Sequence, residues 1–411
     1  MTLDLGRRVA FTIGALLVFR LGTFIPVPGI DGAVLAQLFR SQGGAILDLA
    51  NMLAGGGVRR LAIFALGLAP YLSAAIIIQL FTITIPRLKA LKRHEAGRNR
   101  LNDATRILAV VLAAFQAYGI AKALDSIPGL AVEPGAMFRL SVVLTMTGGA
   151  VVLMWLSEQI TLRGVGNGIA LIFALGIVLE LPSAVAGALE LGRQGFLSFN
   201  AMLGLVILAV ALTALIVVME LARRRLPLEF SARQIGARTI AGRSQLRFKL
   251  NSGGVMPAIF ASWLLLVPIL ISNFVGESSW WNAVARFVGH GQPLFLIAYV
   301  LFIVLFTFIY TALIFSPDAA ADDLKAYGCA VSGVEPGEAT AEHIDGVLSR
   351  VTLLGAAYLA LVYLVPELLI RYAQVPFYLG GASLLIVVCT VLDLQAQVRG
   401  YATIKSGADV R

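Results

Sequence analysis

Two motifs that contain glycine and proline, GLAPYLS at residues 67–73 and GGVMPAI at residues 253–259, lie near the starts of two apolar runs. These runs extend over 61–85 and 254–275. Glycine and proline both weaken a helix that has to continue through them. Interrupted helices at matching positions are typical of membrane proteins built from two inverted repeats. The two motifs therefore predict two related halves, each with a broken second helix.

Further apolar runs surround both motifs and are long enough to cross a bilayer, which takes about 20 residues per helix. There are ten such runs, and an odd number of spans in each half requires the halves to be inverted. The predicted fold is an all-α membrane protein of ten transmembrane helices, with halves at 1–190 and 191–411. The runs are 8–25, 61–85, 105–124, 138–158, 168–189, 200–221, 254–275, 294–315, 347–366 and 376–397.

The composition supports a chain that lies mostly in lipid. Of its 411 residues, 59% are hydrophobic and 13% are charged, and the mean hydropathy is +0.88. Soluble domains have about 45–50% apolar and about 25% charged residues. A water-soluble fold could not hide this much apolar surface, because each domain would need its own polar exterior. A soluble enzyme is therefore excluded.

Lysine and arginine accumulate on the cytoplasmic side of membrane proteins. Here 23 of the 32 lie at the termini and in loops on the side of the N-terminus, including seven in 86–106 and eight in 222–250. This asymmetry predicts a multi-pass protein with both termini in the cytoplasm. The loop at 316–350 is an exception, because it carries seven acidic residues and two basic ones.

The chain contains no motif for catalysis or for binding a cofactor or metal. Its two cysteines and three scattered histidines indicate no disulfide framework and no metal cluster, and there is no phosphate-binding loop. The span interiors are nearly free of charge; Glu158, Glu180 and Glu220 lie near span ends, where long side chains are expected to reach the surface. Ion-coupled transporters usually carry charge at mid-membrane.

Six groups of residues resemble motifs of the SecY family, the bacterial protein-translocation channel, and they occur in the family's order across nearly the whole chain. The first is FRLGTFIPVPGID at 19–31, and the second combines IFALG at 63–67 with PYLSA at 70–74 and Gln79. The other four are WLSEQIT at 155–161 with RGVGNG at 163–168, VMPAIFAS at 255–262, VPFYLGGASLLI at 375–386 and AQV at 396–398.

The resemblance implies an hourglass pore that is closed at its waist by a ring of apolar side chains. Two members of the ring, Leu68 and Phe173, stand where the family usually has isoleucine. An apolar constriction excludes water and ions, yet its side chains can yield around an extended polypeptide. The ring would consist of Leu68, Leu72, Ile169, Phe173, Ile259 and Ile386.

The resemblance also implies a plug and a lateral gate. The segment 46–57 is similar to the half-helix, called the plug, that closes the external funnel of the pore. Within this segment the residues assigned to the plug are Asn51, Gly55, Gly56 and Gly57. The second and seventh helices, with the third and eighth, would form a gate that releases apolar segments into lipid. Ser73 and Gln116 are polar residues that could lie on this gate or could simply hydrogen-bond neighbouring helices.

The loops 222–250 and 316–346 match the family's cytoplasmic docking surface for the ribosome and the SecA motor ATPase. Arg233, Arg238 and Lys249 keep the family pattern, whereas Glu335 stands where the family has an arginine. Small membrane subunits similar to SecE and SecG are the other expected partners. The substrates would be unfolded secretory and membrane polypeptides, and the location would be the bacterial plasma membrane.

Two other functions are compatible with the composition and the inverted halves alone. The first is a secondary transporter of small solutes, and the second is a membrane-insertion factor that has no pore. The scarcity of charge within the spans disfavours the first. Movement of a wholly soluble secretory substrate would distinguish a channel from the second.

Overall fold

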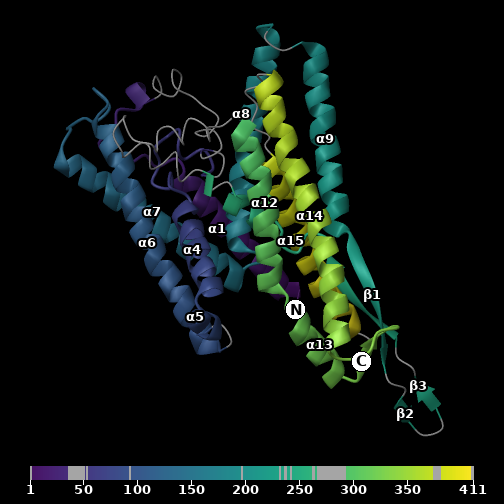
Figure 1. Cartoon of the computed structure of the whole chain (residues 1–411). Helices are drawn as coiled ribbons and strands as arrows, with labels where there is room; N and C mark the ends of the chain where they lie inside the picture. The colour runs from purple at the N-terminus through teal and green to yellow at the C-terminus, as the bar shows by residue number, and fades with distance from the viewer. Residues whose placement is uncertain are drawn as a thin grey trace. The chain divides into compact units, whose positions relative to one another are not determined.

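The structure is a computed structural model that describes residues 2–35, 51, 54–91, 94–195, 198–230, 233–235, 238–240, 243–261, 264–265, 293–373 and 381–408. The chain divides into two compact units. Figure 1 labels the helices and strands that they contain. The first comprises Met1–Phe199, Pro376–Tyr378 and Ile386–Arg411, and the second comprises Asn200–Val375 and Leu379–Leu385. The inverted relation of halves at 1–190 and 191–411 stays a prediction.

Within the described residues, seven helices are long and apolar enough to cross a membrane. They correspond to the predicted third to sixth and eighth to tenth spans. The first predicted span coincides with helix α1, Thr2–Gly22, and the second is an α-helix only from Ala69. Most of the seventh span, 254–275, lies outside the described residues. The fold is therefore mainly helical and membrane-spanning, as predicted, while the count of ten helices is not confirmed.

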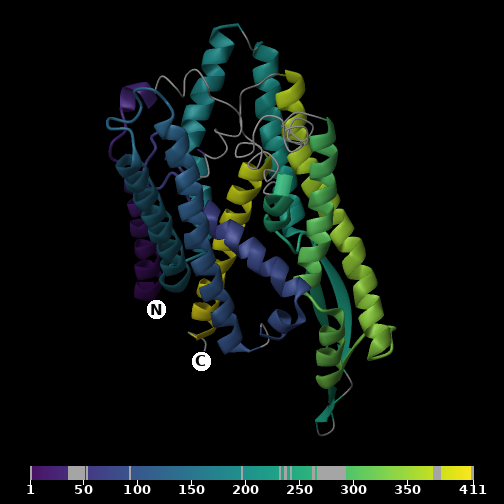
Figure 2. The same ribbon diagram turned by 60° about the vertical axis from the view of Figure 1, so that its left-hand side comes forward.

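The first unit is helical and has a core of small and large side chains at helical spacing. Helix α6 contributes Ala113, Ala117 and Ala121, four residues apart, and Val142 and Met146 of α7 pack into the same cluster. Small residues on one helix let the larger side chains of its neighbour approach closely. The helices are α1, α4 Ala69–Thr84, α5 Pro86–Leu91, α6 Glu95–Asp125, α7 Ala136–Arg163, α8 Gly168–Arg193 and, from Ile386, α15 Gly381–Ala408 (Figure 2).

The segment that follows α1 is paired with the segment that precedes α4. The Val27 amide donates to the Leu61 carbonyl at 2.9 Å, and the Ile63 amide donates to the Ile25 carbonyl at 2.9 Å. An isolated antiparallel bridge between Pro26 and Ala62 lies between these two bonds. The non-helical backbone before α4 is thus hydrogen-bonded to another part of the same unit.

The second unit packs long helices through aromatic contacts. The Tyr299 ring of α12 lies 5.6 Å from the Phe295 ring on the same helix and 5.8 Å from the Tyr363 ring of α14. The latter pair is edge-to-face, a geometry that aromatic rings prefer. The helices are α9 Phe199–Leu221, which joins this unit from Asn200, with α12 Pro293–Ile314, α13 Pro317–Ala326 and α14 Glu338–Ala373.

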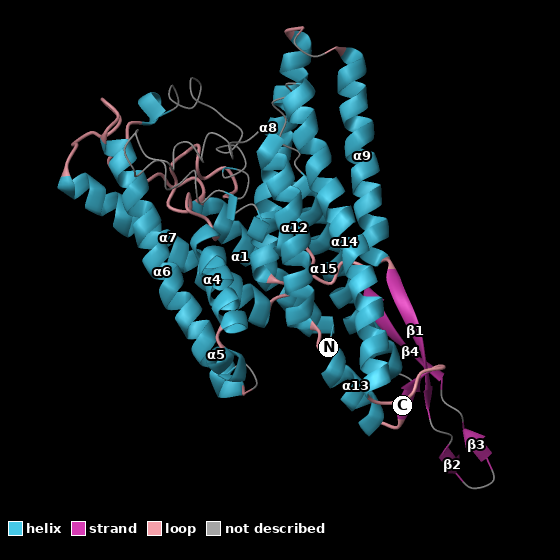
Figure 3. Ribbon diagram, in the orientation of Figure 1, coloured by secondary structure: helices cyan, strands magenta, loops and turns pink. Residues whose placement is uncertain are grey.

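The second unit also contains β-structure where the sequence predicted only loops (Figure 3). A three-stranded antiparallel sheet has the order β4-β1-β5, with Leu226 opposite Leu246 and Leu228 opposite Val331. A two-stranded hairpin, β2–β3, lies between β1 and β4 in the chain. The strands are β1 Arg223–Phe230, β2 Arg233–Ile235, β3 Arg238–Ile240, β4 Arg243–Lys249 and β5 Cys329–Val331.

One face of this sheet is buried against the helices of its own unit. Leu226 of β1 and Phe248 of β4 form a core cluster with Ile344 and Leu348 of α14. The Phe248 ring lies 5.2 Å from the Phe315 ring in an edge-to-face arrangement. These apolar contacts fix the base of the arginine-rich ribbon formed by β1 and β4.

We expect Phe248→Ala to loosen this ribbon, because truncating a buried phenylalanine removes about 3–5 kcal/mol of packing. Trypsin cleavage of the intact protein within 223–249 should become at least severalfold faster. Gln245→Ala, at an exposed position of the same strand, is the control and should leave the rate unchanged. Equal cleavage rates in both variants would show that the sheet is not held by this cluster.

Candidate functional site

The first of the two motifs that contain glycine and proline, GLAPYLS at residues 67–73, forms the start of α4. Gly67 has a φ of +57°, a conformation that residues with a side chain rarely adopt, and it sets the turn into the helix. Pro70 stands in the first turn of α4, where proline needs no amide partner. The Leu72 amide donates to the Leu68 carbonyl at 3.0 Å, so the helical hydrogen bonds begin there. The interruption therefore sets where the second predicted span becomes helical.

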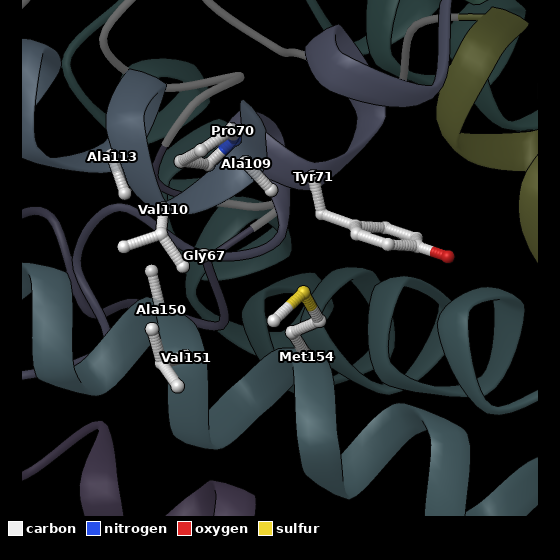
Figure 4. Close-up of a pocket in the computed structure, with 9 residues that line it drawn as sticks. All are labelled: Gly67, Pro70, Tyr71, Ala109, Val110, Ala113, Ala150, Val151 and Met154. Carbon is white, nitrogen blue, oxygen red and sulfur yellow. The ribbon is translucent and has the colours of Figure 1, made fainter. Parts of the chain in front are cut away.

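A small apolar pocket lies beside this interruption, and Figure 4 shows the residues that line it. Tyr71 packs there against the side chains of Ala109 and Met154. Small residues of α6 and α7 leave room for the motif to approach. The lining residues are Gly67, Pro70, Tyr71, Ala109, Val110, Ala113, Ala150, Val151 and Met154, which do not include the predicted ring residues Leu68 and Leu72.

The predicted ring residues are partly or wholly buried. Ile169 and Ile259 are half-buried, and the other four expose 1–6% of their surface. Five of the six belong to the first unit, whereas Ile259 belongs to the second. The closed ring therefore stays a prediction. The four buried residues are Leu68, Leu72, Phe173 and Ile386.

Two of the helices that carry ring residues are joined by hydrogen bonds within the first unit. The Thr390 hydroxyl of α15 donates to the Ile386 carbonyl at 2.6 Å and to the Ala170 carbonyl of α8 at 3.4 Å. The Gly166 amide, just before α8, donates to Gln397 Oε1 of α15 at 2.8 Å. Asn167 caps α8 by accepting from the Ile169 amide at 3.0 Å. These bonds set the position of Ile386 relative to Ile169.

Part of the predicted plug is described in the structure. It comprises Asn51 and the glycine turn, which is formed by residues 54–57. Gly55 and Gly56 have φ values of +61° and +83°, and all three glycines are buried. Asn51 exposes 2% of its surface. The remainder of the predicted half-helix, at 46–50 and 52–53, lies outside the described residues.

The two predicted gate residues lie on neighbouring helices of the first unit. The Ser73 hydroxyl donates to the Ala69 carbonyl of its own helix at 3.0 Å, and Gln116 is half-buried on α6. The bond of Ser73 is made within α4 and is not the bond to a neighbouring helix that is the alternative to a position on the gate. The other predicted gate helices include α12, which belongs to the second unit, so the gate itself stays a prediction.

The predicted docking residues lie on the sheet of the second unit and on the turn before α14. Arg233 and Arg238 belong to the β2–β3 hairpin, and Lys249 is exposed at the end of β4. Glu335 is exposed on the turn between β5 and α14, and its carbonyl accepts from the Thr340 hydroxyl at 2.6 Å. The basic strands and the acidic turn thus belong to one compact unit.

The three carboxylates expected to reach the surface near span ends are half-buried, and each accepts hydrogen bonds. Arg106 Nε and Nη2 donate to the two oxygens of Glu158 at 2.8 and 2.9 Å. Asn251 Nδ2, buried just before the second Gly-Pro motif, donates to Glu220 Oε1 at 2.6 Å and to the Gly254 carbonyl at 3.0 Å. Glu180 Oε2 accepts a hydrogen bond from Asn51 Nδ2, which lies just before the glycine turn in the chain.

Sequence reasoning missed these bonds because their partners are distant in the chain. Among the residues that the structure describes, no three His, Cys, Asp or Glu side chains are placed to hold a metal ion. The carboxylates pair with amides and arginine and hold segments of backbone in place. These contacts give the three carboxylates a structural role in the described part of the chain.

Comparison with known proteins places this geometry in a family. The sequence profile of the SecY family matches residues 62–395. The chain is 46% identical over 404 residues to the "Protein translocase subunit SecY" of Escherichia coli strain K12, a match that covers 96% of this chain and 91% of that protein.

Solved structures share the fold at low sequence identity. "The structure of a protein conducting channel" matches with a TM-score of 0.67 at 18% identity, over 96% of this chain and 92% of that one. A structure described as showing that the plug domain of SecY stabilises the closed channel matches with a TM-score of 0.64 at 17% identity, with the same coverage. Sec61 of a canine ribosome-channel complex has a TM-score of 0.62 at 15% identity, again over 96% and 92%.

Proposed function

This chain belongs to the SecY family, and on that basis we propose that it is the protein-conducting channel subunit of a translocase. It is a channel component and not an enzyme. Unfolded secretory chains cross the membrane through it, and hydrophobic segments leave it sideways into lipid. The observation that carries the proposal is the 46% identity to a translocase subunit over 96% of the chain.

The pore closes at the ring of Leu68, Leu72, Ile169, Phe173, Ile259 and Ile386. An apolar constriction blocks ions by excluding water, and it has no hydrogen-bonding groups that would select one sequence over another. The burial of Leu68, Leu72, Phe173 and Ile386 and the bonds that set the position of Ile386 beside α8 support a defined ring.

The segment 46–57 is the plug, and the helices around Ser73 and Gln116 form one side of the lateral gate. The glycine turn supports the plug assignment, since its positive φ values let the chain reverse closely against α1 and α8. The likeness to a structure described by its plug domain supports it as well.

The basic sheet and the turn at Glu335 form the docking surface for a ribosome or a SecA motor ATPase. The exposed arginines of β1 support this role, because a basic ribbon attracts RNA or acidic protein. One solved relative comes from a ribosome-channel complex. Small membrane subunits similar to SecE and SecG complete the translocase and hold its halves together.

The location is a bacterial plasma membrane, with both termini and the docking surface on the cytoplasmic side. The excess of lysine and arginine on the segments assigned to that side supports this orientation. Seven helices of the described part of the chain are apolar enough to span the bilayer.

The proposal is tested by import of an unfolded, wholly soluble secretory polypeptide into vesicles that contain this chain with its co-purifying membrane subunits. With SecA and ATP outside, we expect the polypeptide to become protected from added protease. Vesicles without the chain are the control. Gradient-driven uptake of small solutes without polypeptide import would favour a transporter, and insertion of membrane proteins alone would favour a factor without a pore.

We expect Glu335→Arg to increase import driven by SecA. The substitution replaces a negative charge on the exposed docking turn with a positive one, and complementary charge accelerates association with an acidic partner. Glu133→Arg, an equal charge change at an exposed site in the loop between α6 and α7, outside both docking loops, is the control. Equal or slower import in Glu335→Arg would mean that the partner is already adapted to the glutamate.

A further inference from the structure

The glycine turn at 54–57 has almost no room for side chains. A methyl group added at Gly55 would lie 2.9 Å from Phe19 Cζ of α1. At Gly56 it would overlap Glu180 Oε1 of α8 and would lie 3.2 Å from Arg60 Nη1. The carboxylate of Glu180 therefore lies directly against the backbone of the turn.

The Glu180 carboxylate also binds Asn51, which precedes the turn by three residues. Asn51 Nδ2 donates to Glu180 Oε2 at 3.4 Å, and Asn51 Oδ1 accepts from the Arg59 amide at 2.9 Å. The Gly56 amide donates to the Asn51 carbonyl at 2.8 Å. Asn51 thus closes the loop 51–59 on itself and also connects it to α8.

Glu180 is itself held in a fixed position. The Ser183 hydroxyl, one turn further along α8, donates to Glu180 Oε2 at 3.2 Å and to the Glu180 carbonyl at 2.8 Å. A side chain fixed by its own helix loses little freedom when it binds the loop. Its negative charge also strengthens the bonds that it accepts.

The opposite side of the turn is held by α1. Arg20 Nη1 donates to the Gly55 carbonyl at 3.2 Å, and its guanidinium stacks 4.5 Å from the Phe24 ring centre. Arg60 stacks 4.3 Å from the same ring centre. Arg20 thus binds the backbone of the turn, whereas Glu180 contacts both the backbone of the turn and the Asn51 side chain.

We propose that Glu180 is a positioning residue that holds Asn51 and the glycine turn 54–57 in the closed position of the channel. The inference rests on the proposed function, since only a plug at 46–57 makes this turn part of the closure. When the turn moves away, the buried amide of Asn51 loses its partner on α8, and the Glu180 carboxylate loses Asn51 while it keeps Ser183. Closure is favoured by these contacts, and the opening equilibrium depends on them.

The test records single-channel currents in planar bilayers that contain the full chain with its co-purifying subunits. The quantity compared between variants is the open probability of the channel in the absence of substrate. We expect Glu180→Ala to raise it on the order of tenfold, the effect of losing a hydrogen bond to a charged group. Glu180→Gln keeps an acceptor oxygen for Asn51 and Ser183, so most of the closure should be restored. Glu190→Ala, which removes an exposed carboxylate of α8 bound to Arg193 and Gln194, is the matched control and should change nothing.

Deletion of 46–54 separates this inference from the proposed function. If the deletion raises the open probability and Glu180→Ala does not, the positioning role is overturned and the plug stands. If neither change has an effect, both the plug and the positioning role fail. In the deletion background Glu180→Ala should have no further effect, and an undiminished effect there would show a general structural role instead. Asn51→Leu removes the same bond from the other side and replaces Glu180→Ala if that variant does not fold.

Discussion

The rest of this structure depends on one constraint, which is that backbone polar groups at membrane depth need partners inside the protein. The apolar run at 61–85 is helical only from Ala69, so its first residues must be satisfied in another way. Pairing of 61–63 with 25–27 and burial of the glycine turn meet this need. A non-helical segment is therefore available next to Leu68 without exposing its backbone to lipid.

The same constraint explains where the charged groups are found. A polypeptide of any sequence can pass only a constriction that does not bind it, and the predicted ring is apolar throughout. The carboxylates of Glu158, Glu180 and Glu220 are not members of the predicted ring and are paired with Arg106, Asn51 and Asn251. These pairs hold helices and turns in place.

The sequence alone predicted the helical membrane fold, the position of the Gly-Pro interruption and the family, because apolar periodicity and ordered motifs are local signals. It missed the sheet at 223–249, although the alternation of Leu226 and Leu228 with exposed neighbours indicates strands. The bond between Asn51 and Glu180 spans 129 residues of sequence, and no local pattern could indicate it. The six predicted ring residues are divided between the two compact units, so the prediction of a ring depends on the family resemblance.

If the predicted ring encloses the moving polypeptide, its side chains must contact that polypeptide during import. This contact is measured by placing a photo-crosslinking amino acid at Phe173 or Ile259 and stalling a secretory chain halfway through import. We expect adducts between the stalled chain and both positions, one in each unit, and none from Val111, an exposed apolar residue on α6. Absence of adducts at both ring positions while Val111 reacts with the chain would mean that the polypeptide does not pass through the ring.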